Sequence, residues 1–140
     1  MKLRGKSKAI QISRPLGELE MEVMKAIWNK GEATGKEVWQ EIKETRKSAL
    51  TTVLTVMDRL SQKGFLGKSK VDGLLVYTPA ITREHYTKQV AGKMLKDYMD
   101  LSSSSLIASF VDTLDELDPL QLKNLALLIE KKKKEGRRQA

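Results

Sequence analysis

The chain of 140 residues has no cysteine, a single histidine and only three prolines. The absence of cysteine excludes disulfide bonds, thiolate metal sites and a cysteine nucleophile. No stretch approaches the roughly 20 apolar residues of a membrane-spanning helix, and the first residues lack the apolar core of a signal peptide. These absences predict a cytoplasmic protein.

Positive charge is what the sequence has in excess. Lys and Arg number 26 against 18 Asp and Glu, which gives a formal net charge of +8. Hydrophobic residues make up 40% of the chain, a share that suits one compact domain or two small ones. The charge favours a polyanionic partner, and for a protein of this size we expect nucleic acid rather than a membrane. Charge alone predicts nonspecific binding as readily as specific binding.

Both ends of the chain are basic. The residues before the first acidic side chain include Lys2, Arg4, Lys6, Lys8 and Arg14, and Lys and Arg also crowd the last ten positions. We predict a mobile N-terminal arm at 1–15 and a mobile C-terminal tail at 131–140. Solvated tails that aid solubility would have the same composition, so these segments do not decide the function.

The first half of the chain predicts three helices. Apolar residues at helical spacing indicate the first helix over 18–29. Thr34 stands three residues before Glu37 in a capping-box arrangement, which predicts a second helix that ends near residue 44. Trp28 and Trp39 fall on the apolar faces of these helices, so we expect them to pack in the core rather than stack on bases.

The third helix, over 48–64, has an unusual outer face. At about 100° per residue, one side carries Leu50, Val53, Leu54, Val56, Met57 and Leu60. The other side, the outward face, carries Ser48, Thr51, Thr52, Thr55, Asp58, Arg59, Gln62 and Lys63. Threonine is β-branched and a poor helix former, so helix stability does not explain three exposed threonines. Their small hydroxyl and methyl groups suit close approach to base edges in a DNA groove, and an ordinary solvated face is the alternative.

A β-hairpin is predicted after Gly64. Two β-type runs lie on either side of Asp72-Gly73, a dipeptide suited to a tight turn. Three helices and a hairpin predict a winged helix-turn-helix domain at 16–80, so the fold class is mainly α with a small β-hairpin wing. Lys68 and Lys70 would lie on the wing, where they either reach phosphate or protect the strand edge.

Three amphipathic helices are predicted after Pro79, in a second domain at 81–130. Thr82 begins the first, Ser102 to Ser105 interrupt it, and Asp118-Pro119 begins the last. Their core would be thin, so we predict a helical dimerisation domain; packing on the N-terminal domain is the alternative. The residues expected at the dimer contact are Tyr86, Val90, Leu95, Leu106, Phe110, Leu114, Leu125 and Leu128.

In LGELEMEVMKAIWNKGEAT, TTVLTVMDRLSQKGFL and the later VYTPAI, the chain resembles the penicillinase-repressor family, which includes repressors of β-lactamase and methicillin-resistance genes. The resemblance covers about Leu16 to Ile129. It implies a homodimeric winged-helix repressor that binds inverted repeats in operator DNA, with base-reading positions on the third helix. The candidate DNA-contacting residues are Lys47, Ser48, Thr51, Thr52, Thr55, Arg59, Lys63, Lys68 and Lys70.

The sequence departs from the family pattern at three points. Thr51 replaces a lysine of the staphylococcal members, which leaves open one phosphate or guanine contact and the operator sequence. A signalling protease cuts those members before a phenylalanine in the penultimate helix. The similar position here is Ser109-Phe110, with serine in place of asparagine, so a signalling protease is a candidate partner. The copper-responsive branch uses a cysteine-rich motif, which this chain lacks.

Catalytic residues do not group anywhere in the sequence. Gly67-Lys68-Ser69 resembles the end of a phosphate-binding loop, but Gln62 stands where that motif needs its first glycine. The lone His85 has no accompanying acid, base or nucleophile. We therefore expect no enzyme, no cofactor and no metal site. Two other classes stay open beside the repressor: a nonspecific architectural DNA-binding protein, and a winged-helix module that binds other proteins.

Overall fold

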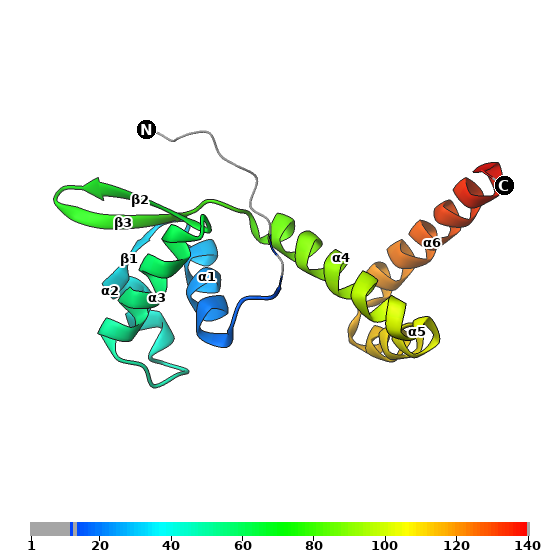
Figure 1. Ribbon diagram of the computed structural model, residues 1–140, viewed down its shortest axis with the longest axis horizontal. Helices are drawn as coiled ribbons and strands as arrows, with labels where there is room; N and C mark the ends of the chain where they lie inside the picture. The colour runs from blue at the N-terminus through cyan, green and yellow to red at the C-terminus, as the bar shows by residue number, and fades with distance from the viewer. Residues whose placement is uncertain (1–11, 13, 140) are drawn as a thin grey trace. The chain divides into compact units, whose positions relative to one another are not determined.

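The computed structural model describes residues 12 and 14–139. The predicted basic arm, 1–15, therefore lies largely outside the described residues. In chain order the elements are α1 (Glu18–Lys30), β1 (Ala33–Thr34), α2 (Gly35–Ile42), α3 (Leu50–Gln62), β2 (Leu66–Val71), β3 (Leu74–Pro79), α4 (Arg83–Leu101), α5 (Ser103–Asp112), the 3-10 helix η1 (Thr113–Glu116) and α6 (Pro119–Gln139) (Figure 1). The chain divides into two compact units, Met1–Met94 and Leu95–Ala140. Within the described range, no helix combines the length and the apolar character that crossing a membrane requires.

The first unit is a winged helix-turn-helix domain, as predicted. Helices α1, α2 and α3 surround an apolar core and pack with a three-stranded antiparallel sheet of order β1-β3-β2. The completely buried side chains of this core are Val23, Met24, Ile27, Val38, Val53, Met57 and Leu60. On α1 and α3 these residues recur three or four positions apart, and on α2 the buried Ile42 follows Val38 by four positions, which is the spacing that places apolar groups on one helical face.

The predicted hairpin is present, and the sheet has one additional strand. Asp72 and Gly73 have φ angles of 52° and 81°, so both adopt the left-handed conformation that a two-residue hairpin turn needs. The register places Val71 opposite Leu74 at the tip. β1 pairs with β3 through only Ala33 and Thr34. A strand of two residues has no alternating pattern, so periodicity did not predict it.

The first turns of α4 belong to the core of the first unit. The Tyr86 hydroxyl accepts a hydrogen bond of 2.9 Å from the backbone N–H of Leu16. The Tyr86 ring lies 5.9 Å from that of Trp28 and 6.3 Å from that of Phe65, centroid to centroid. Val90 is only 8% exposed and packs in the same cluster. The predicted domain start at residue 81 therefore falls inside the first unit, and this core already buries Tyr86 and Val90, two of the residues that the sequence places at the dimer contact. Helical periodicity identified the apolar stripe but not the surface on which it packs.

The predicted C-terminal tail is helical. α6 continues through residues 131–139, the segment for which the sequence predicts a mobile tail. Lysine and glutamate are good helix formers, and cations in the last turn interact favourably with the helix dipole. Arg137 and Arg138 occupy that last turn.

The second unit buries few of its apolar side chains. In the described part of α5, η1 and α6, no residue is fully buried, and Leu106, Leu114 and Leu125 are only partly so. Ser102 begins α5, because its hydroxyl accepts a hydrogen bond of 3.2 Å from the Ser105 N–H. The large apolar side chains exposed here are Leu95, Tyr98, Met99, Leu101, Ile107, Phe110, Val111, Leu120, Leu122, Leu127, Leu128 and Ile129.

Replacing Thr34 with alanine tests the capping box at the start of α2. The Thr34 hydroxyl accepts from the Glu37 N–H at 3.2 Å, and Glu37 accepts from the Thr34 N–H at 2.8 Å. Loss of the first bond is expected to lower the free energy of unfolding by about 1 kcal/mol. Urea unfolding followed by tryptophan fluorescence measures this. Thr52→Ala is the matched control, because Thr52 is an exposed threonine in the first turn of α3 and its side chain forms no hydrogen bond with a described residue. Equal stability of the two variants would contradict the cap.

Candidate nucleic-acid interface

The outward face of α3 meets solvent as the periodicity predicted, with two corrections: Ser48 precedes the helix and is half-buried, and Leu54 is exposed. Thr51, Thr52 and Thr55 are exposed, while Val53 and others on the opposite side are completely buried. Leu54, assigned to the apolar side, is 39% exposed. Its side chain lies so close to Gly35 that a Cβ at residue 35 would collide with it. Leu54 therefore packs at the start of α2 rather than in the centre of the core.

The three threonines differ in the hydrogen bonds that their hydroxyls already make. The Thr55 hydroxyl donates to the Thr51 carbonyl at 2.9 Å, so its donor is used within the helix. Its methyl group and its oxygen lone pairs stay available. No described residue forms a hydrogen bond with the Thr51 or Thr52 side chain. Thr51 and Thr52 can thus donate or accept, whereas Thr55 offers an apolar contact and an acceptor.

The turn before α3 is fixed by a tryptophan. The Nε1 of Trp39 donates to the Ser48 carbonyl at 2.9 Å, and its partly buried ring packs against the core as predicted. The Nζ of Lys43 lies over the Trp39 ring, 4.4 Å from the ring centroid. Ala49 is the N-cap of α3 and provides no side-chain hydrogen bond, so the first amides of α3 have no side-chain acceptor among the residues that the structure describes. Lys47, just before this end, is exposed.

A lysine of the wing is bonded to α3. The Nζ of Lys68, on β2, donates to Asp58 Oδ1 at 2.7 Å, and Gln62 Nε2 donates to Asp58 Oδ2 at 2.9 Å. The hydrogen bond to Asp58 raises the pKa of Lys68 above its usual value. Lys70, two residues further along β2, is exposed and forms no ion pair with a described residue. Figure 1 shows the hairpin that carries both lysines projecting past the helices of the first unit.

Lys63, at the other end of α3, is also paired. Its Nζ lies 2.9 Å from Glu20 Oε2 on α1. Burial opposes the ionisation of Glu20, but hydrogen bonds from the Gly17 amide and from Lys63, with the charges of Lys63 and Arg59, outweigh it and lower the pKa of Glu20. Arg59 itself is exposed and forms no ion pair within the described part of the chain.

Two acids are the site residues that the sequence did not single out. Asp58 and Glu20 each hold one cation of the candidate interface. The spacing of Asp58 and Gln62, four residues apart on one helix, is a signal that could have found their contact. Glu20 and Lys63 are 43 positions apart, and only the packing of α1 against α3 brings them together. A third ion pair joins Arg46 to Glu22 at 3.0 Å and ties the α2–α3 connection to α1.

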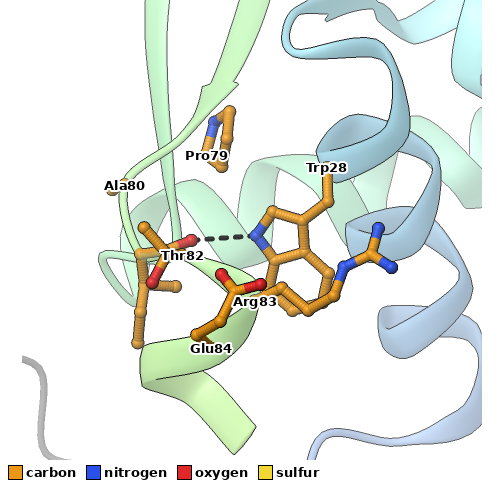
Figure 2. A pocket seen from close by; sticks show the side chains of 7 residues that line it. Trp28, Pro79, Ala80, Thr82, Arg83 and Glu84 are labelled. Atoms are coloured by element: carbon orange, nitrogen blue, oxygen red, sulfur yellow. Dashed lines mark hydrogen bonds between the residues drawn. The ribbon is translucent and has the colours of Figure 1, made fainter.

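A hollow of about 450 Å³ lies where α4 leaves the sheet, next to Trp28 (Figure 2). The Trp28 Nε1 donates to the Ile81 carbonyl at 2.9 Å. Arg83 donates to Asn29 Oδ1 at 2.7 Å, and its guanidinium lies 5.6 Å from the Trp28 ring centroid. These groups hold the start of α4 against α1, and we therefore assign the hollow to this junction rather than to a ligand.

The remaining predicted site residues lie in the second unit. Leu106 and Phe110 are on α5, Leu125 and Leu128 are on α6, and Leu114 is in η1. Leu95 is near the end of α4. The predicted cleavage position, Ser109-Phe110, is inside α5, where Phe110 is 45% exposed. These residues belong to the second unit, whereas the outward face of α3 belongs to the first.

Known proteins resemble this chain over most of its length. A sequence model of the family described as "Penicillinase repressor" matches residues 16–131. The penicillinase repressor of Bacillus licheniformis is 28% identical over 118 residues, which cover 84% of this chain and 91% of that protein. The transcriptional regulator BlaI of Mycobacterium tuberculosis (strain ATCC 25618 / H37Rv) is 31% identical over 113 residues, which cover 76% and 80%. The solution structure of monomeric Bacillus licheniformis BlaI with the blaP half-operator matches 54% of this chain and 92% of that chain, at 33% identity and a TM-score of 0.47.

The lowered pKa of Glu20 predicts a measurable loss of stability in acid. A carboxylate with a lowered pKa in the folded state stabilises the fold above its unfolded value, 4.5, and that contribution is lost as the pH falls through the folded pKa. Glu20→Gln cannot titrate, so the stability difference between wild type and this variant should shrink as the pH is lowered from 7 to about 3.5. Urea unfolding at both pH values measures it. A difference independent of pH would contradict the assignment.

Proposed function

This chain belongs to the penicillinase repressor family, and on that basis we propose that it is a sequence-specific transcriptional repressor that binds inverted-repeat operator DNA as a homodimer. The observation that carries the proposal is the outward face of α3, where three exposed threonines replace the long polar side chains usual on a solvated helix. Relatives over most of the chain are named as a repressor and a transcriptional regulator. A nonspecific architectural DNA-binding protein is the alternative.

In this proposal, α3 reads bases in the major groove. A major groove is wide enough to admit one α-helix, and small side chains let that helix approach the base edges closely. The hydroxyls of Thr51 and Thr52, which form no hydrogen bond with a described residue, can exchange hydrogen bonds with base edges or phosphates. The methyl of Thr55 can contact a thymine methyl, since its hydroxyl already bonds to Thr51. Sequence preference would therefore depend on contacts that a purely charged surface cannot make.

Phosphate binding would come from the cations around α3. Lys47, Arg59 and Lys70 are exposed and free of ion pairs with the described residues. Ser48 and the first amides of α3 lie beside Lys47, and an uncapped helix start attracts anions. Lys63 and Lys68 keep two further N–H donors each beyond the bond to their acid partner. Together these groups would fix the position of α3 on the duplex without themselves specifying sequence.

The second unit would supply the dimer contact. Its large apolar side chains are exposed, among them Leu95 at 43%, Phe110 at 45% and Leu128 at 64%. A unit this small seldom stabilises itself, and contiguous exposed apolar groups mark interaction surfaces. A second copy offers the same surface, so one two-fold contact would cover both. Of the predicted contact residues, we retain Leu95, Leu106, Phe110, Leu114, Leu125 and Leu128.

Repression would then follow from occupancy. A two-fold protein presents two α3 helices to two half-sites, which selects an inverted repeat and excludes polymerase from the DNA it covers. Release by a signalling protease at Ser109-Phe110 stays a prediction. This bond lies within regular helix, so cleavage would require α5 to unwind locally before a protease could bind it in an extended form.

The reading role of the threonines is tested with duplexes selected from a random pool by the purified protein at about 150 mM salt. Wild type is expected to enrich an inverted repeat. Thr52→Ala combined with Thr55→Ala should reduce the preference for the enriched duplex over a shuffled duplex by about tenfold, because the lost contacts are to bases. Fluorescence anisotropy with both duplexes measures the ratio, and salt-sensitive background binding should persist.

Thr87→Ala is the matched control for this double variant. Thr87 is an exposed helical threonine whose hydroxyl donates to the carbonyl four residues earlier at 2.8 Å, as that of Thr55 does. It lies on α4, away from the proposed interface, so its replacement should leave the ratio unchanged. Full preference in the double variant would remove the threonines as readers. Retention of DNA without an enriched motif would favour the architectural alternative, and no retention would favour a module that binds other proteins.

Leu128→Asp tests the dimer surface. A charge at a buried contact position is costly, so this variant should dissociate at a protein concentration at least about tenfold higher than wild type. Sedimentation equilibrium measures the dissociation constant. Asn124→Asp places the same side chain on an exposed polar position of α6 and should leave the dimer unchanged. Equal dissociation constants for wild type and Leu128→Asp, or a monomeric wild type, would contradict the proposed dimer.

A further inference from the structure

We propose that Asp58 is a positioning residue of the DNA interface. It holds the ammonium of the wing lysine Lys68 at a position from which the remaining N–H donors can bind a phosphate while α3 lies in the groove. This inference rests on the proposed function and adds a residue and a role to it. It begins from an anomaly of charge. Asp58 is an acid on the face of α3 proposed to enter a groove lined with phosphates, where a negative side chain is unfavourable unless it has another role.

Both carboxylate oxygens of Asp58 are engaged by the protein. Oδ1 accepts from Lys68 Nζ at 2.7 Å, and Oδ2 accepts from Gln62 Nε2 at 2.9 Å. Gln62 is one helical turn further along α3, so it orients the carboxylate from the same helix. An aspartate that reads bases would instead accept from the amino group of a cytosine. With one donor already placed on each oxygen, the geometry favours a role within the protein.

The contact joins two elements that each carry part of the interface. Asp58 lies on α3, next to Arg59 and one turn after Thr55, and Lys68 lies on β2. A lysine side chain has a long flexible stem, so without a partner its ammonium would occupy many positions. The bond to Asp58 selects one of them. Because an ammonium has three N–H donors, Lys68 can bind Asp58 and a phosphate at the same time.

Stability does not account for this ion pair. The side chains of Lys68 and Asp58 are 36% and 49% exposed, and pairs at such exposure contribute little to folding because solvent screens them. Tyr77 on β3 is directly opposite Lys68 in the strand register, and it is buried. Removal of the Asp58 charge should therefore leave the fold intact and change the behaviour of Lys68.

The pairing also lowers the nonspecific attraction of the surface. Asp58 cancels the charge of Lys68 at long range, while at contact distance the lysine can still donate to a phosphate. A surface arranged in this way gains binding only where a phosphate sits in the right place relative to α3. The expected consequence is a higher ratio of specific to nonspecific affinity, not a higher affinity for all DNA.

A double-mutant cycle tests the inference, with Asp58→Asn, Lys68→Met and the two combined. The probes are the duplex enriched from the random pool and a shuffled duplex of the same composition. Asp58→Asn should weaken binding to the enriched duplex about fivefold and leave binding to the shuffled duplex equal or stronger, since one anion is gone. In the Lys68→Met background, Asp58→Asn should cause no further loss on the enriched duplex, because its only proposed action is through Lys68.

Asp72→Asn is the matched control for charge. Asp72 is an exposed acid at the wing turn, it has no described ion-pair partner, and asparagine tolerates its left-handed φ of 52°. This variant should strengthen binding to both duplexes by the same factor and leave their ratio unchanged. Thermal unfolding of all variants, which should agree with wild type within a few degrees, excludes a general loss of structure.

Three outcomes would overturn the inference. In the first, the effects of Asp58→Asn and Lys68→Met on binding to the enriched duplex are independent. In the second, Asp58→Asn strengthens binding to both duplexes, as Asp72→Asn does. In the third, Asp58→Asn weakens binding to both duplexes and greatly lowers the melting temperature. In each case Asp58 would not act through Lys68. If the wild-type protein enriched no motif, the proposed function would fail and this inference with it, whereas an enriched motif with an independent pair would remove this inference alone.

Discussion

The burial of one face of α3 is the constraint on which the rest of the interface depends. Val53, Met57 and Leu60 are completely buried against α1 and α2, so the rotation of α3 about its axis is fixed. An α-helix then has no freedom in what it presents on the other side, because each residue is about 100° from the next. The exposure of Thr51, Thr52 and Thr55 is thus a consequence of core packing. A change in the core that rotated α3 would move the whole outward face.

The charges of the first unit are organised more closely than the composition suggests. Lys63, Lys68 and Arg46 are bonded to acids on other elements, while Lys47, Arg59 and Lys70 are exposed without an ion pair in the described structure. Only part of the basic composition is therefore available as unpaired charge around α3. For a proposed repressor this matters, because nonspecific binding grows with every phosphate neutralised, whereas discrimination depends on contacts that only one sequence satisfies.

The two units differ in how completely they bury their apolar groups. The first has a closed core, and the first turns of α4 complete it through Tyr86 and Val90. The second leaves large apolar side chains such as Leu128 in solvent. In the proposed dimer the two units would therefore have different roles. The first unit would fold on its own core and bind DNA, while the second would gain stability from contact with the second copy. Since stability of the second unit would then depend on association, dimerisation and folding of that unit would be coupled.

Periodicity and turn chemistry in the sequence determined the local structure: the three helices, the cap at Thr34, the Asp72-Gly73 hairpin and the outward threonines. These follow from contacts a few residues apart, which a sequence displays directly. The tertiary structure alone decided that Tyr86 and Val90 complete the first core, and that a two-residue strand at Ala33 joins the sheet. It also decided that Glu20 holds Lys63 and that Asp58 holds Lys68. Those contacts depend on which surfaces meet in space. An apolar stripe or a single charged residue in the sequence does not indicate which distant residue it will contact.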